Sequence, residues 1–269
     1  MNISVFIKQV PDGAAVRMDR ERMTVLREGV ESIINPLDQV ALEAALEIRN
    51  REGGAVTVLT MGPAQSEAAL REAVALGADR AILLTDPAFA GADTLATSHV
   101  LAAAALKIEP FPDLFLCGMQ TIDSDTGHVG PQVAEELDLP QVCGVNEIHR
   151  EGDALVVKRL SDGFLETVRV TLPALMTVSQ ELCPPKDPSL GALEAAFSED
   201  NIVVWGRKEL GLKKEEVGLE GSATRVWRLH RPPRRKEGEV VSGPPEKLLD
   251  KFISKLEALS LLEEENDRG

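Results

Sequence analysis

Polar and glycine residues gather in the segment GMQTIDSDTGHVGP, which runs from Gly118 to Pro131. The segment follows the apolar run DLFLCG and precedes QVAEELDL, whose apolar residues have helical spacing. It is therefore predicted to join a strand to a helix, which is the place where an open α/β sheet binds ligands. The unpaired N–H groups and partial positive charge of a helix start suit a phosphate group.

Three further polar segments follow or flank predicted strands. They are INPLDQ at residues 34–39, TMGPA at 60–64 and FAGADTLATS at 89–98. In a parallel sheet these segments could converge on one edge, and glycines in them allow the backbone to approach a ligand closely. Gly62 and Gly91 lie in these three segments, and Gly118 and Gly127 lie in the segment described first. The pattern predicts a pocket for a nucleotide or dinucleotide.

Individual side chains in these segments have possible roles other than ligand binding. Asp93 and Asp125 are both suited to capping a helix N-terminus. Asp123 and Asp125 could form a metal pair, although no third hard ligand is evident, and His128 could be a general base or a surface helix residue. The chain has no Walker A motif, no GxGxxG after its first strand and no GxSxG elbow. The residues alone therefore predict a nucleotide-binding α/β domain without catalytic side chains.

Strands and helices alternate through the first half of the chain. Strands are predicted at 3–10, 55–60, 80–85, 113–118 and 174–178, and helices at 35–54, 64–78, 93–108 and 132–139. This order predicts an α/β fold with a doubly wound, mostly parallel, Rossmann-like sheet. Two short extended pieces around a turn are expected in residues 16–29, and an antiparallel excursion from about residue 143 up to the last core strand.

The C-terminal third is less regular. Residues 179–200 read as a Pro-containing surface loop that leads to a short helix, and 231–245 read as a linker. A helix at 246–262 places six apolar residues on one stripe: Leu248, Leu249, Phe252, Ile253, Leu256 and Leu259. That stripe is expected to dock on its own domain or on a partner subunit. We predict a nucleotide-binding domain at 1–225 and a docking arm at 226–269.

Composition excludes several classes of protein. The 269 residues carry a net charge of −15 and contain no tyrosine, which disfavours binding to nucleic acid. The three cysteines are widely spaced and read as free thiols. The N-terminus does not resemble a signal peptide, and no apolar run approaches the ~20 residues of a membrane span. A cytoplasmic protein without a transmembrane segment is expected.

Several ordered blocks carry a resemblance to a known family. The blocks are VFIKQVPD, INPLDQVALEAAL, TMGPAQSEAALREAVALGADRAILL, CGMQTIDSDTGHVGPQVAEELDLPQV and LPALMTV. They resemble the β subunit of an electron transfer flavoprotein over residues 1 to about 182, and the C-terminal tail resembles that family's arm. The resemblance implies a heterodimer with an α subunit that holds a mobile, electron-transferring FAD.

The family divides according to the ligand of the β subunit. Ordinary members hold a structural AMP, whereas electron-bifurcating members hold a second FAD that accepts hydride from NADH. The second FAD sends one electron to a low-potential acceptor, ferredoxin or flavodoxin, and the other through the α-subunit FAD to a dehydrogenase. The segments FAGADTLATS and DSDTGHVGP are similar to the bifurcating group. The alternatives are a single-flavin carrier with AMP in this subunit and an adenine-nucleotide-sensing module.

The resemblance also implies the residues that line the nucleotide. Hydroxyls of Thr94 and Thr97 and backbone N–H groups near Thr126 and Gly127 are expected at the phosphates, and Asp123 at ribose or ribityl hydroxyls or in ordering its loop. No catalytic side chain is implied, because the flavin does the redox chemistry. The full set is Phe6, Ile7, Lys8, Asn35, Asp38, Met61, Gly62, Asp93, Thr94, Thr97, Gly118, Gln120, Thr121, Asp123, Ser124, Asp125, Thr126, Gly127, His128 and Val129.

One residue outside this set is implied in docking. Leu190, in a predicted partner-docking loop at residues 183–197, matches the apolar anchor with which related proteins dock on an acyl-CoA dehydrogenase. The stretch that follows, SLGALEAAFSED, is acidic where many relatives are rich in lysine.

Overall fold

The structure is a computed structural model that describes residues 1–12, 17–19, 24–26, 32–198, 202–228, 240–259 and 261. The chain divides into two compact units, Met1–Leu229 and His230–Gly269. Each unit is described by itself below. The boundary expected after residue 225 stays a prediction.

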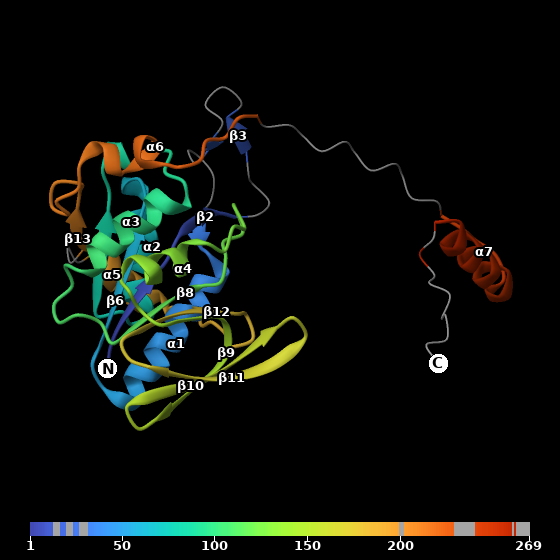
Figure 1. Cartoon of the computed structure of the whole chain (residues 1–269), viewed down its shortest axis with the longest axis horizontal. Coiled ribbons are helices and arrows are strands. Elements are labelled where there is room, and N and C mark those ends of the chain that lie inside the picture. The colour runs from blue at the N-terminus through green and yellow to red at the C-terminus, as the bar shows by residue number, and fades with distance from the viewer. Residues whose placement is uncertain are drawn as a thin grey trace. The chain divides into compact units, whose positions relative to one another are not determined.

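Unit 1 is built on one large sheet, which contains nine of the strands in the described residues (Figure 1). Their order across the sheet is β11-β10-β9-β12-β8-β1-β6-β7-β13. Every neighbouring pair from β9 to β13 is parallel, and only the β9–β10 and β10–β11 pairs are antiparallel. The strands are β1 Asn2–Phe6, β6 Ala55–Met61, β7 Arg80–Leu84, β8 Leu114–Gly118, β9 Gln141–Glu151, β10 Ala154–Ser161, β11 Phe164–Thr171, β12 Ala174–Val178 and β13 Ile202–Trp205. The predicted α/β fold with an antiparallel excursion is confirmed.

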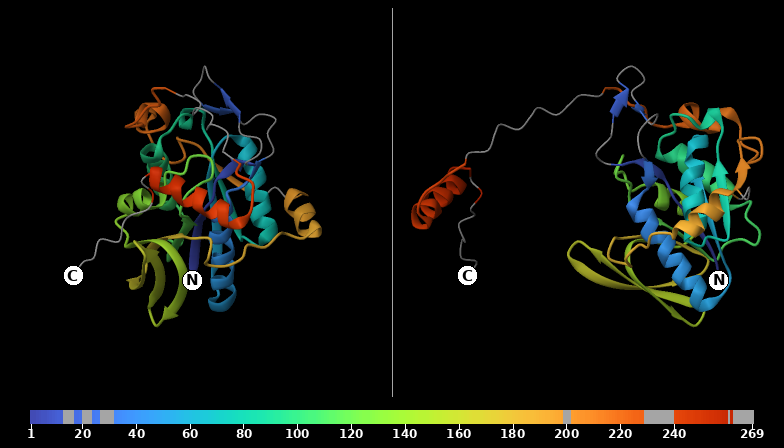
Figure 2. Two further views of the ribbon diagram at one scale, coloured as in Figure 1. Left: turned by 90° about the vertical axis from the view of Figure 1, so that its right-hand side faces the viewer. Right: turned by 180° about the vertical axis from the view of Figure 1, so that it is seen from behind.

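Helices cover both faces of the parallel strands. Successive strand side chains point to opposite faces, so they pack in two separate hydrophobic cores. One core contains α1 (Pro36–Glu52) and α2 (Glu67–Leu76), and the other contains α3 (Thr94–Ala105) and α4 (Val129–Glu136). Two of these helices have local signals that the sequence predicted, a start and a stop for α1 and a stop for α2. Pro36 lies in the first turn of α1, and Gly53 and Gly77 follow α1 and α2 with positive φ. Figure 2 shows the helices on either side of the sheet and the β10–β11 hairpin extending beyond them.

The predicted strand at residues 3–10 is two strands. β1 ends at Phe6, and β2 (Gln9–Pro11) pairs instead with β5 (Ser32–Ile34). The break occurs because the N–H of Lys8 donates to the carboxylate of Asp38 at 2.8 Å, where a continuing strand would bind its neighbour. The two extended pieces expected in 16–29 are confirmed as β3 (Arg17–Asp19) and β4 (Thr24–Leu26), which pair antiparallel.

The chain after Val178 contains more structure than the sequence predicted. The expected short helix is α5 (Leu190–Ser198), but β13 was not predicted. β13 pairs with β7 and forms one edge of the large sheet. Short helical turns complete unit 1: η1 Ala64–Ser66, η2 Pro87–Phe89, η3 Lys214–Glu216 and α6 Gly218–Gly221.

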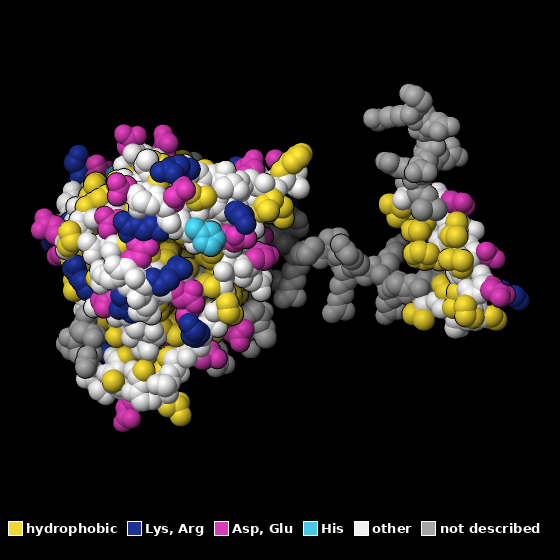
Figure 3. All heavy atoms as spheres, turned by 90° about the horizontal axis from the view of Figure 1, so that it is seen from below, with side chains coloured by type: hydrophobic (Ala, Val, Ile, Leu, Met, Phe, Trp, Pro, Cys, Tyr) yellow, Lys and Arg dark blue, Asp and Glu magenta, His cyan; other side chains and the backbone are white. Residues whose placement is uncertain are grey.

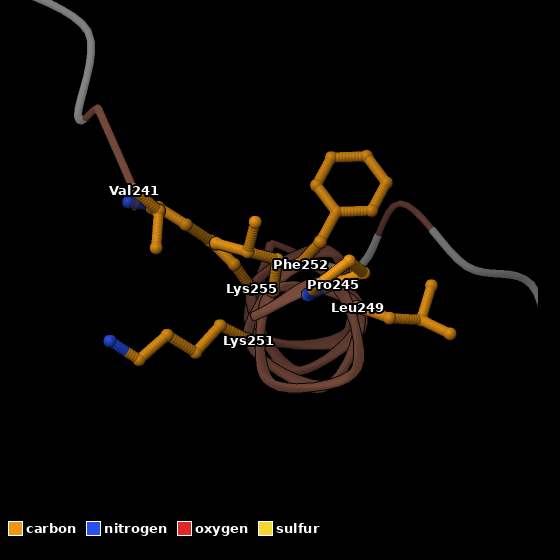
Figure 4. A pocket seen from close by; sticks show the side chains of 7 residues that line it. Val241, Pro245, Leu249, Lys251, Phe252 and Lys255 are labelled. Carbon is orange, nitrogen blue, oxygen red and sulfur yellow. The ribbon is translucent and has the colours of Figure 1, made fainter. Parts of the chain in front are cut away.

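The described part of unit 2 is dominated by one amphipathic helix, α7 (Pro245–Ala258), which has no buried residue. Leu249 and Phe252 are about 60% exposed, and apolar side chains gather on this helix in Figure 3. They line a shallow hollow with Val241 and the stems of Lys251 and Lys255 (Figure 4). Residues 231–239 of the predicted linker lie outside the described residues. No helix in the described residues is long and apolar enough to cross a membrane.

Candidate functional site

The candidate site lies where the order of the parallel strands reverses. From β1 the chain continues to β6 and β7, which lie on one side of β1 within the sheet. It then continues to β8 and β12, which lie on the other side of β1. The carboxyl ends of β1 and β8 are therefore neighbours at the switch point, which is the usual ligand-binding edge of an open α/β sheet. The predicted polar segments follow these strands and their neighbours, so the fold brings them to one edge.

Asp38 bridges the two strands at the switch point. It lies in the first turn of α1 and is 4% exposed. One carboxylate oxygen accepts the N–H of Lys8 and the other accepts the N–H of Gly118, both at 2.8 Å. Burial raises the pKa of Asp38 to about 7, although the two donated N–H groups favour the carboxylate. Asp38 thus holds together the carboxyl ends, or exits, of β1 and β8.

Asn35 fixes the loop after β8 in the same way. Its side chain is fully buried, and its amide nitrogen donates to the carbonyl of Gln120 at 2.9 Å. Its amide oxygen accepts the N–H of Ile122 at 3.2 Å. The sequence predicted that Asn35 and Asp38 line a ligand, and the structure places both side chains in hydrogen bonds with the chain's own backbone.

A second hydrogen-bond network, centred on Asp123, also holds the loop after β8. The ammonium of Lys8 lies 2.8 Å from the carboxylate of Asp123, whose side chain is only 5% exposed. The hydroxyls of Thr121 and Ser124 donate to the same carboxylate at 2.8 and 3.2 Å. Burial opposes ionisation of Asp123, but Lys8 and the two hydroxyls outweigh it and hold the pKa of Asp123 below its usual value. Asp123 therefore orders its loop, which is one of the two roles expected of it.

The start of α3 combines a capped turn with two unengaged hydroxyls. Asp93 caps the helix by accepting the N–H of Ala96 at 2.9 Å, so the predicted cap is confirmed. Its second oxygen accepts both the N–H and the hydroxyl of Thr224. Burial opposes ionisation of Asp93, but these donors outweigh it and lower the pKa of Asp93. Thr94 and Thr97 are half-buried, and their hydroxyls have no hydrogen bond to the described residues.

The start of α4 is open. The helix begins at Val129, and His128 occupies the N-cap position without a side-chain hydrogen bond to the first turn. Asp125 lies three residues before His128 and has a φ of 55°, so its predicted capping role is wrong. Gly127 follows with a φ of 66°, a conformation that favours glycine. The first turn of α4 thus lacks a side-chain acceptor among the described residues.

The starts of α3 and α4 lie side by side. The Ser98 hydroxyl, which is fully buried, lies 2.7 Å from the carbonyl of Thr94 and 3.3 Å from that of Val129. It also lies 3.1 Å from the side-chain oxygen of Gln132. This contact was not predicted, because a serine inside a helix has no distinctive sequence pattern.

The remaining predicted residues differ in what they can offer a ligand. The side chains of Phe6 and Ile7 are buried in the two cores, so only their backbone faces the edge. Met61 ends β6 and Gly62 follows it, and both are half-buried. Gly118 admits no side chain, since a Cβ there would lie 2.6 Å from Asp38 Oδ1.

Two features lie away from this edge. Leu190, the predicted docking residue, is 86% exposed at the start of α5. A small polar hollow lies between α1 and β9, lined by Glu47, Arg51 and His149 among others. No group of three or more histidine, cysteine or acidic side chains in the described residues is placed to hold a metal ion.

The fold and the edge define an open, doubly wound α/β protein with its candidate site at the topological switch point. Comparison with known proteins then identifies the family: the electron transfer flavoprotein domain matches residues 22–201. A protein named electron transfer flavoprotein subunit beta, from Thermoanaerobacterium thermosaccharolyticum, is 47% identical over 257 residues, which cover 95% of this chain and 98% of the relative. The chain belongs to the electron transfer flavoprotein β-subunit family.

Two further relatives have other names. The caffeyl-CoA reductase-Etf complex subunit CarD of Acetobacterium woodii is 45% identical over 245 residues, covering 90% of this chain and 92% of the relative. Protein FixA of Azorhizobium caulinodans is also 45% identical over 245 residues, covering 88% of this chain and 86% of the relative.

Proposed function

We propose that this chain is the β subunit of a heterodimeric, electron-bifurcating electron transfer flavoprotein, and that its switch-point edge holds an FAD reduced by NADH. The observation that carries the proposal is the pair of adjoining helix starts at α3 and α4. Ser98 joins the two starts, and both offer donor groups that the described residues leave unengaged.

The donors suit a pyrophosphate better than a single phosphate. The first turn of α4 offers backbone N–H groups, and α3 offers the hydroxyls of Thr94 and Thr97 one helical turn apart. A pyrophosphate carries more charge over a greater length, so it benefits from two helix starts, each contributing about 0.3–1 kcal/mol. A hydrogen bond to a charged oxygen contributes roughly 1.5–3 kcal/mol before competing losses. AMP carries a single phosphate and needs only one of the two starts.

The buried residues of the edge preorganise the site. Asp38 and Asn35 hold the exits of β1 and β8, and the Lys8–Asp123 pair holds the loop that leads to α4. These contacts order the loop that leads to α4 before the ligand arrives, which lowers the ordering cost of binding. When bound, FAD supplies the hydride and electron chemistry, so the chain itself needs no acid or base.

The proposal includes three partners. An α subunit would carry the second FAD, and the apolar stripe of α7 is the surface proposed to dock on it. A dehydrogenase would receive one electron through a docking loop that contains Leu190, and ferredoxin or flavodoxin would receive the other. The name of the relative CarD, which places that protein in a complex with a reductase, supports a dehydrogenase-type partner.

Anaerobic titration with NADH tests the proposal. We expect the purified heterodimer with its α subunit to contain two flavins per heterodimer and to lose flavin absorbance as NADH is added. A heterodimer that contains one flavin and does not respond to NADH would support the ordinary carrier with AMP. A complex without any flavin would support an adenine-nucleotide-sensing module.

A further inference from the structure

The C-terminal segment of unit 1, residues 217–224, packs against the loop at residues 88–92 that precedes α3. Val217 is 1% exposed and packs in the core that contains α3 and α4. The N–H of Leu219 donates to the carbonyl of Ala90 at 3.1 Å. Between them, Gly218 has a φ of 58°, and a Cβ there would lie 1.9 Å from the carbonyl oxygen of Ala88. The close approach of the two backbones therefore requires this glycine.

Asp93 extends this fastening to the start of α3. Its Oδ1 accepts the N–H of Ala96 as the helix cap, and its Oδ2 accepts the N–H and the hydroxyl of Thr224 at 2.8 and 2.9 Å. The N–H of Asp93 donates to the hydroxyl of Ser222 at 2.8 Å. One residue thus makes bonds to the helix start and to a segment about 130 positions away in sequence.

We propose that Asp93 is a positioning residue that couples the nucleotide site to the C-terminal segment, so that nucleotide binding and the seating of residues 222–224 stabilise each other. The inference rests on the proposed function, because it assumes that a phosphate-bearing ligand binds at the start of α3.

The sign of the coupling follows from the charge of Asp93. A carboxylate beside a helix start repels a phosphate group that binds there. With the segment seated, Thr224 donates twice to Oδ2 and disperses its charge away from the first turn of α3. With the segment released, Oδ1 still caps Ala96, but Oδ2 loses both donors and its charge is no longer dispersed beside the ligand. A bound phosphate therefore favours the seated segment, and the seated segment favours the phosphate by the same factor.

The coupling reaches the residues that lead to unit 2. Thr224 is followed by Val226 and Trp227, which are 61% and 95% exposed. Both side chains are already largely exposed, so the two bonds from Thr224 to Asp93 are what hold this part of the segment to the start of α3. Release of Thr224 would therefore loosen the residues that follow it in unit 1.

Hydrogen exchange of the peptide 219–228 in the full heterodimer tests the proposal, with AMP and FAD used as separate probes. In the wild type, either bound probe should slow exchange of this peptide at least about fivefold, the lower end of typical coupling factors. Asp93→Asn retains a capping oxygen but loses an acceptor for Thr224. In that variant the peptide should exchange faster, and the probe should no longer protect it.

Affinity for the probe supplies a readout that a purely structural role would not change. Thr224→Val should weaken binding of the probe at least about fivefold, and Thr224→Ser, which keeps the hydroxyl, should restore it. Thr167→Val, at an exposed position of β11, is the matched control and should leave affinity unchanged. A probe that binds without protecting the peptide, or a Thr224→Val variant of wild-type affinity, would overturn the coupling alone. Failure of both probes to bind the wild type would overturn the proposed function and the coupling with it.

Discussion

Replacement of Asp38 by asparagine is the sharpest test of how the switch-point edge is held together. The carboxylate accepts two backbone N–H groups, those of Lys8 and Gly118. An asparagine side chain has one oxygen and one NH₂ group, so one backbone N–H would face another donor. Leaving a buried group unsatisfied costs about 1–3 kcal/mol of unfolding free energy. The exits of β1 and β8 should separate, and binding of FAD or AMP should weaken.

The effect on stability should depend on pH in a defined direction. Burial raises the pKa of Asp38 from 3.8 to about 7. A raised pKa in the folded state means that the stabilisation is complete below pH 3.8 and is lost as the pH rises through 7. Between pH 5 and 8 the wild type should lose up to about 3 kcal/mol from this group, at 1.36 kcal/mol per pKa unit. Asparagine does not titrate, so Asp38→Asn should remove that part of the slope.

Urea unfolding followed by tryptophan fluorescence at several pH values measures this difference. The stability of the wild type relative to Asp38→Asn should fall as the pH rises from 5 to 8. A relative stability that rises with pH would refute the reasoning, because it would mean that the two N–H donors outweigh burial. Asp113→Asn is a matched control, since Asp113 accepts the N–H of Asn2 at the opposite edge of β8 and β1. That variant should retain nucleotide binding.

Three further changes test the ligand and partner surfaces. Deletion of residues 240–269 should weaken the heterodimer, because burial of the α7 stripe would contribute several kcal/mol at ~25 cal/mol per Å² of apolar surface. Titration with the α subunit measures the affinity, and an unchanged affinity would contradict a docking role. Leu190→Ala should slow electron transfer to the dehydrogenase in stopped-flow measurements and leave NADH reduction intact, whereas Leu106→Ala, equally apolar and 66% exposed, should change neither. Thr94→Val combined with Thr97→Val should lower FAD occupancy of this subunit alone, assayed after separating the subunits, and full occupancy would exclude these hydroxyls from the site.

The elements with local signals were predictable from the sequence. α1 carries Pro36 in its first turn and Gly53 after its last, and the cap at Asp93 follows directly from the residue type and its position. These signals act over a few residues, so they survive in the folded chain. The parallel sheet was predictable because its buried strands are continuous apolar runs.

What the sequence did not reveal depends on contacts between distant residues. The break between β1 and β2 depends on Asp38, 30 positions after Lys8. β13 is a four-residue edge strand that exists because it pairs with β7, about 120 positions earlier. The second role of Asp93 depends on Thr224, which has no motif of its own. Asp125 was misread as a cap because the helix start lies further along the chain, at Val129.

The inward direction of the polar side chains was also invisible in the sequence. Asn35 and Asp38 belong to a segment that the family resemblance assigns to the nucleotide, and their types suit ligand hydroxyls. Asn35 is 0% exposed and Asp38 is 4% exposed, and both side chains bond to the chain's own backbone. The same residue types serve either role, so the further expectation that these two residues line a ligand stays a prediction.

Cofactor stoichiometry tests the central claim most directly. The heterodimer of this chain and its α subunit is purified, and the bound cofactors are released with acid. FAD and AMP are then quantified per heterodimer. We predict two FAD and no AMP, with one FAD assigned to the switch-point edge of this chain. One FAD and one AMP per complex would contradict the bifurcating function and leave an ordinary electron carrier.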